Sequence, residues 1–299
     1  MFGNIATAYL LQWMLFFLRK HKLAITLHGV VSLKKVNKNF VRENNSKLPV
    51  WLVKLSFKII YKPLCIWPKK VVVHEEYFKN ILVDEYGAKA DKIEVIHLGV
   101  ENLTSLQKNE ACERIKLDSS RDLVLFMGYA TGYKGIDLLI EGFCEYSKNN
   151  PNAYLIIGAG KHSKLKNDEE YLKEYARLQN KAQRLISGNQ YEWAGFIKED
   201  DIVTYYSASD VSIIPYTISM SSSGPMAFAI GYEKPFLASD VFSEVIEDKN
   251  IIFKRTPSDL SKKLDEFFKN KENFRKGLGK MKEERLWDNI GKQTYKIYK

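Results

Sequence analysis

Short apolar runs alternate along this chain with segments in which apolar residues recur every three or four positions. The short runs predict buried strands at 24–27, 71–73, 93–97, 123–127, 154–157, 191–194, 211–215, 236–238 and 251–253. The helical periodicity predicts helices at 50–62, 75–86, 135–147, 168–186, 199–207, 224–231 and 258–269. We expect the first of these helices to stop at Pro63, because proline lacks an amide hydrogen. The alternation implies βαβ units and an α/β fold with parallel, doubly wound sheets.

Two lobes are expected, because the alternation stops at a polar stretch and restarts beyond it. We place an N-terminal Rossmann-like lobe at 1–104, a linker at 105–121, a second Rossmann-like lobe at 122–282 and a last helix at 283–299. A Rossmann-like lobe needs roughly 150 residues to close its sheet. The first lobe should therefore be incomplete, with exposed strand edges that favour self-association or a partner chain through residues 1–100.

The formal net charge of +10 is concentrated in the first third of the chain. Residues 1–100 hold 16 Lys and Arg against 7 Asp and Glu, a net of +9, which leaves 30 against 29 for the remainder. Lys54, Lys58 and Lys62 share one stripe of a predicted helix that also carries aromatic residues. Such helices lie on anionic membranes. We expect that surface as a partner rather than nucleic acid; the alternative is a core helix whose lysines face water.

The cysteines and the first apolar segment indicate in which compartment of the cell the protein is expected. Cys65, Cys112 and Cys144 form no CxxC or Cys/His cluster, which argues against a disulfide framework and a structural metal. The apolar segment from Ile5 to Leu18 would span about 21 Å as a helix, short of the ~30 Å core of a bilayer. We therefore expect a buried helix there, and a cytoplasmic protein able to lie on the inner face of the membrane.

A glycine-containing loop follows the strand predicted at 123–127. It places Gly128, Tyr129 and Lys134 at the carboxyl end of a parallel strand, where doubly wound sheets bind anions. Lys134 would then contact phosphate. Taken alone, it could equally be a lysine that faces water.

A serine-rich loop precedes the helix predicted at 224–231. Its serines suit the N-cap, and Pro225 suits the first helical turn, where its missing amide costs nothing. The amides and hydroxyls of Ser222, Ser223 and Gly224 could hold a diphosphate at the positive end of the helix dipole. The alternative is an ordinary capped helix.

Six segments in fixed order resemble the retaining glycosyltransferases of family 4, also called glycosyl transferases group 1. These are Lys92 to Val100, Gly128 to Asp137, Ile156 to Gly160, Trp193 to Ile197, Ala208 to Tyr216 and Ser222 to Pro235. No single segment is diagnostic, but the ordered series is quite specific. The resemblance implies a GT-B fold, with the donor nucleotide on the C-terminal lobe and a last helix that crosses back to the N-terminal lobe.

The resemblance also assigns roles to residues. Lys134 and the Ser222 to Gly224 loop would contact the diphosphate of a UDP-sugar or GDP-sugar, with no further cofactor. The loop of Gly195, Phe196 and Ile197 would border the base, and His28 would reach the donor sugar as a catalytic residue beside Lys134. Without the resemblance, His28 would be an ordinary loop or core histidine. No metal is implied, because no carboxylate cluster or Asp-x-Asp is placed to hold one.

Three departures from the family pattern stand out. Tyr129 replaces a basic residue of the first phosphate loop, and Ser221 and Ala229 replace a pair of glutamates around the second. The ribose thereby loses its usual acceptor. The first strand-loop units of a family N-terminal lobe do not precede the strand at 24–27.

The expected activity is transfer of a sugar, with retention, from a nucleoside diphosphate sugar to a glycan or a lipid-linked acceptor. The alternative is a non-catalytic subunit that binds nucleotide sugars and needs a second chain to complete its first lobe. A dehydrogenase is disfavoured, because no GxGxxG follows a strand with an acidic residue about twenty positions on.

Overall fold

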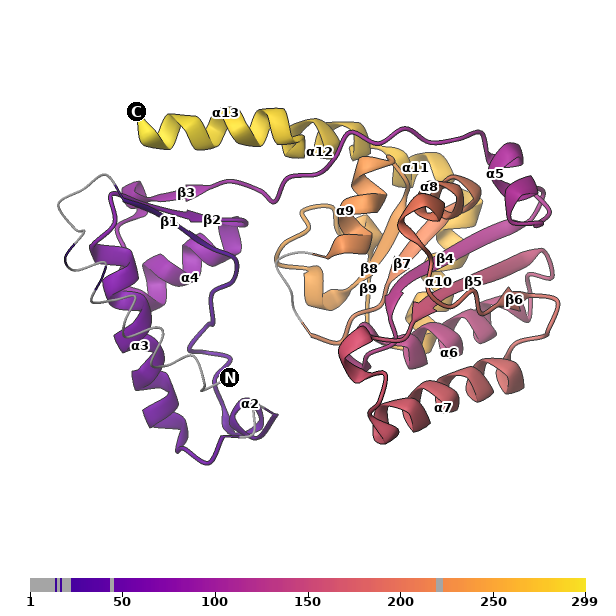
Figure 1. Cartoon of the computed structure of the whole chain (residues 1–299), viewed down its shortest axis with the longest axis horizontal. Helices are drawn as coiled ribbons and strands as arrows, with labels where there is room; N and C mark the ends of the chain where they lie inside the picture. The colour runs from indigo at the N-terminus through magenta and orange to yellow at the C-terminus, as the bar shows by residue number, and fades with distance from the viewer. Residues whose placement is uncertain (1–13, 15–16, 18–22, 44–45, 219–222) are drawn as a thin grey trace. The chain divides into compact units, whose positions relative to one another are not determined.

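The computed structural model describes residues 14, 17, 23–43, 46–218 and 223–299. The chain divides into two compact units: Met1–Leu98 together with Trp287–Lys299, and Gly99–Leu286 (Figure 1). Most of the segment 5–18, for which we expected a buried helix, lies outside the described residues; Met14 and Phe17 are described and exposed. Within the described part of the chain, no helix is both long and apolar enough to cross a membrane.

The first unit is built on parallel strands that the sequence predicts. Among the described residues its sheet has the order β1-β2-β3, with β1 at Ala24–Leu27, β2 at Lys70–Val73 and β3 at Ile93–Val95. Residues of β2 alternate between the two faces, as strand geometry requires. Val71 and Val73 pack in one apolar cluster, and Val72 packs in another.

Helices cover both faces of this small sheet (Figure 1). Phe78, Ile81 and Leu82 of α4 (Glu76–Tyr86) pack with Val71 and Val73. On the other face, α13 (Trp287–Tyr298) contributes two isoleucines to the cluster around Val72. Among its described residues, the unit also holds α2 (Lys38–Glu43), α3 (Val50–Ile66) and the short 3-10 helix η2 (Ala90–Lys92).

Two helices of the first unit differ from expectation. Helix α3 does not stop at Pro63 but continues to Ile66. A proline inside a helix removes one amide, and its ring crowds the carbonyl four residues before it. The next turn forms nonetheless, because the Trp67 amide donates to the Pro63 carbonyl at 3.0 Å. Helix α2 lies between the strand predicted at 24–27 and the helix predicted at 50–62, where no helix was predicted, and Val41 of α2 packs with Val53 of α3.

The second unit is a six-stranded parallel sheet with the order β6-β5-β4-β7-β8-β9. The strands are β4 (Asp122–Tyr129), β5 (Ala153–Gly160), β6 (Tyr191–Glu192), β7 (Val211–Ile214), β8 (Phe236–Ser239) and β9 (Ile252–Phe253). All eight residues of β5 and most of β4 are buried, because both faces of a parallel sheet are covered by helices. The α/β fold class with parallel sheets is thereby confirmed.

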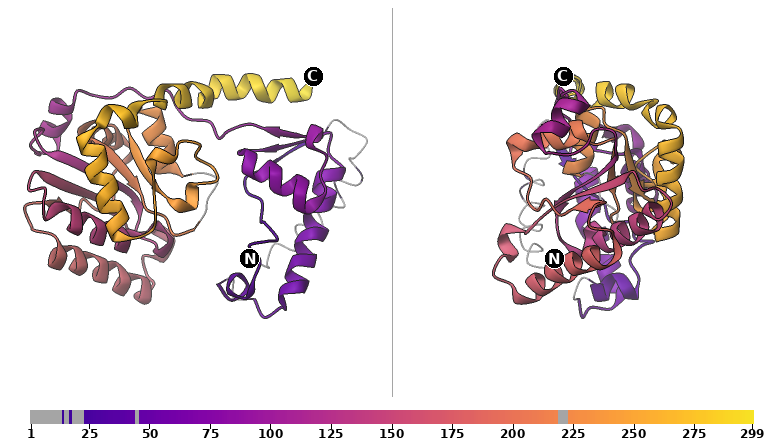
Figure 2. Two further views of the ribbon diagram at one scale, coloured as in Figure 1. Left: turned by 180° about the vertical axis from the view of Figure 1, so that it is seen from behind. Right: turned by 90° about the vertical axis from the view of Figure 1, so that its right-hand side faces the viewer.

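Figure 2 shows helices on both sides of this sheet. Helix α6 contacts α7 and α10, α5 contacts α8, and α9 contacts α12. The helices are α5 (Lys108–Arg114), α6 (Ile136–Ser147), α7 (Glu169–Leu185), α8 (Glu199–Ala208), α9 (Gly224–Gly231), α10 (Pro257–Lys269), α11 (Lys271–Arg275) and α12 (Leu278–Arg285). Short 3-10 helices are η3 (Gly132–Lys134), η4 (Ser163–Leu165), η5 (Asp240–Phe242) and η6 (Lys249–Ile251).

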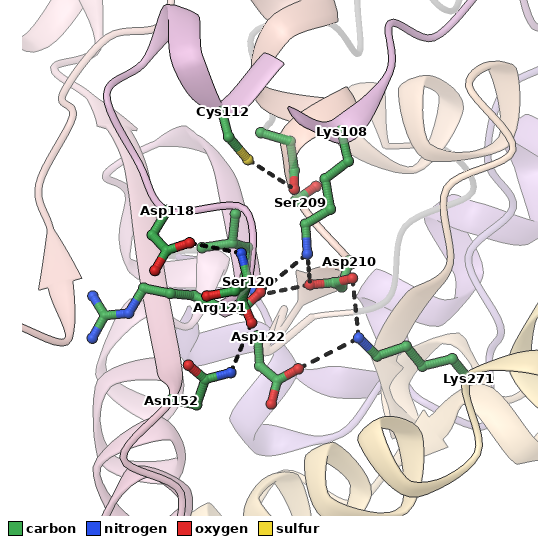
Figure 3. Close-up of polar contacts among 12 residues, drawn as sticks. Lys108, Cys112, Asp118, Ser120, Arg121, Asp122, Asn152, Ser209, Asp210 and Lys271 are labelled. Carbon is green, nitrogen blue, oxygen red and sulfur yellow. Dashed lines mark hydrogen bonds and ion pairs between the residues drawn. The ribbon is translucent and has the colours of Figure 1, made fainter. Parts of the chain in front are cut away.

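The stretch 105–121, which the sequence led us to expect as a linker, holds α5 and belongs to the second unit. Lys108 of α5 and Lys271 of α11 both reach Asp210, at 2.9 and 3.1 Å (Figure 3). The Asp210 carboxylate also accepts from the Leu123 amide at 2.9 Å. Burial acts to raise the pKa of Asp210, but these hydrogen bonds and charges outweigh it, so the pKa lies below its ordinary value. Lys108 thereby ties the stretch to the second unit through Asp210.

Candidate functional site

The strand order of the second unit singles out one edge of its sheet. From β4 the chain steps outward to β5 and β6, and it then returns to β7 on the other side of β4. Doubly wound sheets bind ligands beyond the carboxyl ends of their strands at such a reversal. The loop after β4 carries Lys134, and the loop after β7 leads to Ser223, so both predicted phosphate loops begin at this point.

Lys134 is buried inside this edge, with 7% of its surface exposed. Its ammonium group donates to the hydroxyl of Tyr216. It also lies 4.0 Å from the centre of the Tyr216 ring and 5.0 Å from that of Tyr133. Burial lowers the pKa of Lys134 to about 8. The alternative of a lysine that simply faces water does not fit this environment, because the side chain is held by two aromatic residues.

The two loops are locked together through their backbones. Gly135 has a left-handed conformation with φ of 70°, and a Cβ atom there would lie 1.8 Å from the carbonyl oxygen of Pro215. Next to this contact, the Thr217 amide donates to the Tyr133 carbonyl at 2.8 Å. Only glycine allows the backbones to approach so closely, so Gly135 determines where Lys134 stands relative to Tyr216.

Helix α9 begins at the same edge. Ser223 is its N-cap, and the Ser223 hydroxyl accepts from the Met226 amide and lies 2.7 Å from the Tyr216 hydroxyl. Because the charged lysine ammonium can only donate, the Tyr216 oxygen accepts from Lys134. Between the Tyr216 and Ser223 hydroxyls, either can be the donor. Gly224 is exposed in the first turn of α9. One hydrogen-bonded chain thus joins Lys134 to the start of the helix.

Three residues that the sequence analysis singled out around α9 do not line this edge in the described structure. Ser221 and Ser222 fall in the stretch 219–222, which lies outside the described residues. Ala229 is fully buried in the apolar core of the unit. Its methyl group cannot accept a hydrogen bond from a ribose.

Thr131 adds a group that we did not predict. Its hydroxyl oxygen is buried and has no hydrogen-bond partner among the described residues. A buried hydroxyl left in this state costs about 1–3 kcal/mol. The same residue lines a cavity of about 480 Å³ whose other walls come from α6 and α7. A ligand oxygen beside the loop would satisfy the hydroxyl.

Aromatic side chains gather beside the phosphate loop at the ends of β4, β5 and β6. The rings of Tyr129 and Phe196 are nearly parallel, with centres 6.1 Å apart, and Tyr129 also meets His162 at 4.9 Å. Phe196 is 62% exposed and follows Gly195, whose φ is 73°. Ile197, the third residue of this predicted nucleoside loop, is instead buried. The structure thus places the Tyr129 ring against those of His162 and Phe196.

The first unit carries a separate group of histidines, one after each strand of its sheet. His28, predicted as catalytic, follows β1, and its Nδ1 lies 3.0 Å from Nε2 of His74, which follows β2. His97, after β3, donates through Nδ1 to the His74 carbonyl at 2.9 Å and lies 3.4 Å from the Glu75 carboxylate. The described residues contain no group of three or more His, Cys, Asp or Glu side chains able to hold a metal ion.

The sequence reading missed Tyr216, Thr131, His162 and His74. A signal existed for each, because every one of them stands within a few residues of the carboxyl end of a predicted strand. Their residue types are common in cores and loops, however, and only the packing shows that Tyr216 holds Lys134 and that His74 holds His28.

Comparisons with known proteins bear on the family and the fold of the chain. The family model described as Glycosyl transferases group 1 matches residues 107–285. Mannosylfructose-phosphate synthase of Agrobacterium fabrum is 23% identical over 45% of this chain and 30% of its own length. An uncharacterized glycosyltransferase of Methanocaldococcus jannaschii is 24% identical over 77% of this chain and 60% of its own length. The chain therefore spans about 30% to 60% of the curated relatives it matches.

Solved glycosyltransferases share the fold. A glycosyltransferase from Rickettsia africae superimposes with a TM-score of 0.64 and 17% identity, over 99% of this chain and 94% of that one. HepE from Anabaena in complex with UDP gives a TM-score of 0.73 and 15% identity, over 97% and 76%. At these identities the likeness shows the GT-B fold, and it shows no more than the fold.

Proposed function

Because the chain belongs to the glycosyl transferases group 1 family, we propose that it transfers a sugar from a nucleoside diphosphate sugar to an acceptor, with retention at the anomeric carbon. The observation that carries the proposal is the buried Lys134, held by Tyr216 at the strand reversal of the second unit. A cation taken out of water is costly unless an anion or a hydrogen-bond partner compensates it. A donor diphosphate would supply that anion.

Three groups of this edge suit a diphosphate. The Lys134 ammonium supplies charge, and the Thr131 hydroxyl supplies a donor that lacks a partner among the described residues. The start of α9 supplies the Gly224 amide, since Pro225 has no amide hydrogen and the Met226 amide donates to Ser223. Negative charge grows on the diphosphate as the sugar leaves, so these groups would stabilise the transition state more than the ground state. They also supply positive charge without a metal, and we propose metal-independent transfer on that basis.

The donor nucleoside would lie against the flat rings of Tyr129 and Phe196. Two rings so nearly parallel offer a face for a base. UDP-sugars are the first donors to test, since HepE structures were solved with UDP and with UDP-glucose; GDP-sugars are the second. His28 keeps the role that the family resemblance implies, contact with the donor sugar, and we propose a glycan or a lipid-linked molecule as the acceptor.

Donor binding followed by turnover tests the proposal. UDP, GDP and their sugars are screened by thermal shift, and release of the nucleoside diphosphate is then followed with glycan and lipid-linked acceptors, with and without EDTA. We expect one nucleotide class to raise the Tm and its sugar to be turned over in EDTA, with the anomeric configuration retained by NMR. Binding without turnover by the isolated chain would favour the alternative, a non-catalytic subunit that needs a second chain. Absence of binding by every donor would contradict both.

A second proposal places the protein on an anionic membrane, at its cytoplasmic face, through α3. Trp51, Leu55 and Ile59 recur every four residues along this helix and are 66%, 43% and 41% exposed. Lys58 and Lys62 are exposed on the same helix, and Lys54 is half-buried. Apolar groups that face water beside lysines suit the boundary between headgroups and acyl chains. Val53 of the same helix is buried in an apolar cluster of the first unit, so α3 packs through that face and leaves Trp51 exposed on another.

Vesicle co-sedimentation tests this membrane proposal. Each lysine near an anionic leaflet contributes about 1 kcal/mol, so replacing Lys58 and Lys62 by Gln should weaken binding to phosphatidylserine vesicles roughly 30-fold. The control replaces the exposed Lys148 and Lys276 of the second unit by Gln, which removes the same charge and should have little effect. Equal loss in both double variants, or binding that is indifferent to lipid charge, would contradict the proposal.

A further inference from the structure

His74 is a buried, polar residue at the centre of the first unit, and the reaction proposed above does not use it directly. It follows the middle strand β2, and only 6% of its surface is exposed. Both ring nitrogens have partners: Nδ1 lies 2.8 Å from the Ile96 carbonyl and Nε2 lies 3.0 Å from Nδ1 of His28. The ring thus links β3 to the residue that follows β1.

The hydrogen bonds of His74 determine where its own proton lies. A carbonyl oxygen can only accept, so Nδ1 of His74 must carry hydrogen and donate to Ile96. Burial lowers the pKa of His74 and outweighs the opposing effects of the Ile96 carbonyl and Glu75, while His28 and His97 add to the lowering. The neutral ring has one hydrogen, already placed on Nδ1, so Nε2 of His74 is an acceptor.

The acceptor at Nε2 of His74 determines the state of His28. The atom 3.0 Å away is Nδ1 of His28, and a hydrogen bond there requires that Nδ1 carry the hydrogen. When His28 is neutral, its Nε2 then holds the lone pair. The tautomer of a histidine is set by the bond that its other nitrogen makes. On the opposite side of His74, His97 donates to the His74 backbone carbonyl, which helps to fix the residue.

We propose that His74 is a positioning residue that holds His28 as the Nδ1–H tautomer, so that Nε2 of His28 is the nitrogen that accepts a hydrogen bond from a substrate hydroxyl. The part that concerns the substrate rests on the sugar-transfer function proposed above. The assignment of the His28 tautomer does not rest on that function, because it follows from the contacts of the protein alone. The two parts can therefore fail independently.

Nitrogen-15 NMR of the full chain, labelled at its five histidines, tests the tautomer without any substrate. Long-range correlations between ring protons and ring nitrogens distinguish Nδ1–H from Nε2–H, and a His28→Asn variant assigns the signal. We expect His28 to be Nδ1–H in the parent and to shift toward Nε2–H in His74→Ala. His74→Gln offers an amide oxygen near the position of Nε2 and should restore the parent pattern, which loss of packing alone would not do.

Three outcomes would overturn the proposal: an Nε2–H signal for His28 in the parent, an unchanged signal in a folded His74→Ala, or no recovery in a folded His74→Gln. If His74→Ala does not fold, the parent spectrum and His74→Gln decide. Once a donor and an acceptor are known, kcat should fall at least about tenfold in His74→Ala and recover in His74→Gln with little change in KM. A correct tautomer in a protein that turns over no sugar would leave this assignment standing and remove only the proposed function.

Discussion

Replacing Gly135 by alanine is expected to destabilise the second unit by about 3 kcal/mol or more and to abolish nucleoside diphosphate binding. A left-handed conformation costs a residue with a Cβ atom about 1–2 kcal/mol, and φ at Gly135 is 70°. The added Cβ would also lie 1.8 Å from the Pro215 carbonyl oxygen, a backbone atom that cannot swing aside as a flexible side chain would. The loop after β4 must therefore separate from the loop after β7, and Lys134 must leave Tyr216.

Thermal unfolding and calorimetric titration with UDP and GDP measure these two losses. Gly188→Ala is the matched control, because Gly188 has no atom within 4 Å of a Cβ position and no positive φ. It should leave both the Tm and nucleotide affinity close to those of the parent. An equal Tm in Gly135→Ala and Gly188→Ala would mean that the two loops are not held together as the structure has them.

The strands were predictable from sequence because their pattern is strong. A strand covered on both faces must be apolar at nearly every position, and the eight buried residues of β5 stand out for that reason. The α/β alternation predicted parallel, doubly wound sheets, but the order of the strands within each sheet was not predicted. Helix α5 was missed because its buried side is small, limited to Ala111 and Cys112. Its Lys108 forms an ion pair with Asp210, so the segment appears polar in the sequence.

The candidate site was predictable in its backbone and less so in its side chains. Glycines and a capped helix after two strands mark a phosphate loop by their chemistry, so Gly128, Lys134 and Gly224 could be proposed from the sequence. The contact of Lys134 with Tyr216 joins residues 82 positions apart, and no local pattern contains it. The aromatic surroundings of Tyr129 depend in the same way on where the loops after β5 and β6 meet it.

Lys134→Met is expected to weaken nucleoside diphosphate binding about 100-fold while leaving nucleoside binding nearly unchanged. Methionine keeps much of the length and apolar surface of the side chain and removes its charge. A hydrogen bond to a charged group contributes about 1.5–3 kcal/mol, and each 1.4 kcal/mol corresponds to about a factor of ten in affinity. Lys148→Met, at the exposed far end of α6, is the control for removing one positive charge from the same unit. Equal affinities in Lys134→Met and the parent would exclude Lys134 as a phosphate ligand.

The pH dependence of binding tests the same residue without disrupting it. Burial lowers the pKa of Lys134 to about 8 in the free protein, and a bound diphosphate would raise it by favouring the charged form. As pH rises through about 8, the free protein loses the proton that the complex needs, so binding must be coupled to proton uptake. Above that pH the affinity should fall about tenfold per pH unit. Below it, Lys134 is already protonated in the free protein, so its titration should add no pH dependence to the affinity. The diphosphate adds little to this pH dependence, since the second pKa of a phosphate is about 6.

Titration calorimetry at pH 8.5 in buffers of different ionisation enthalpy counts the protons taken up on binding. The parent should take up protons, whereas Lys134→Met should take up none, and its affinity should not change with pH. A slope that survives in Lys134→Met would assign the titrating group to another residue.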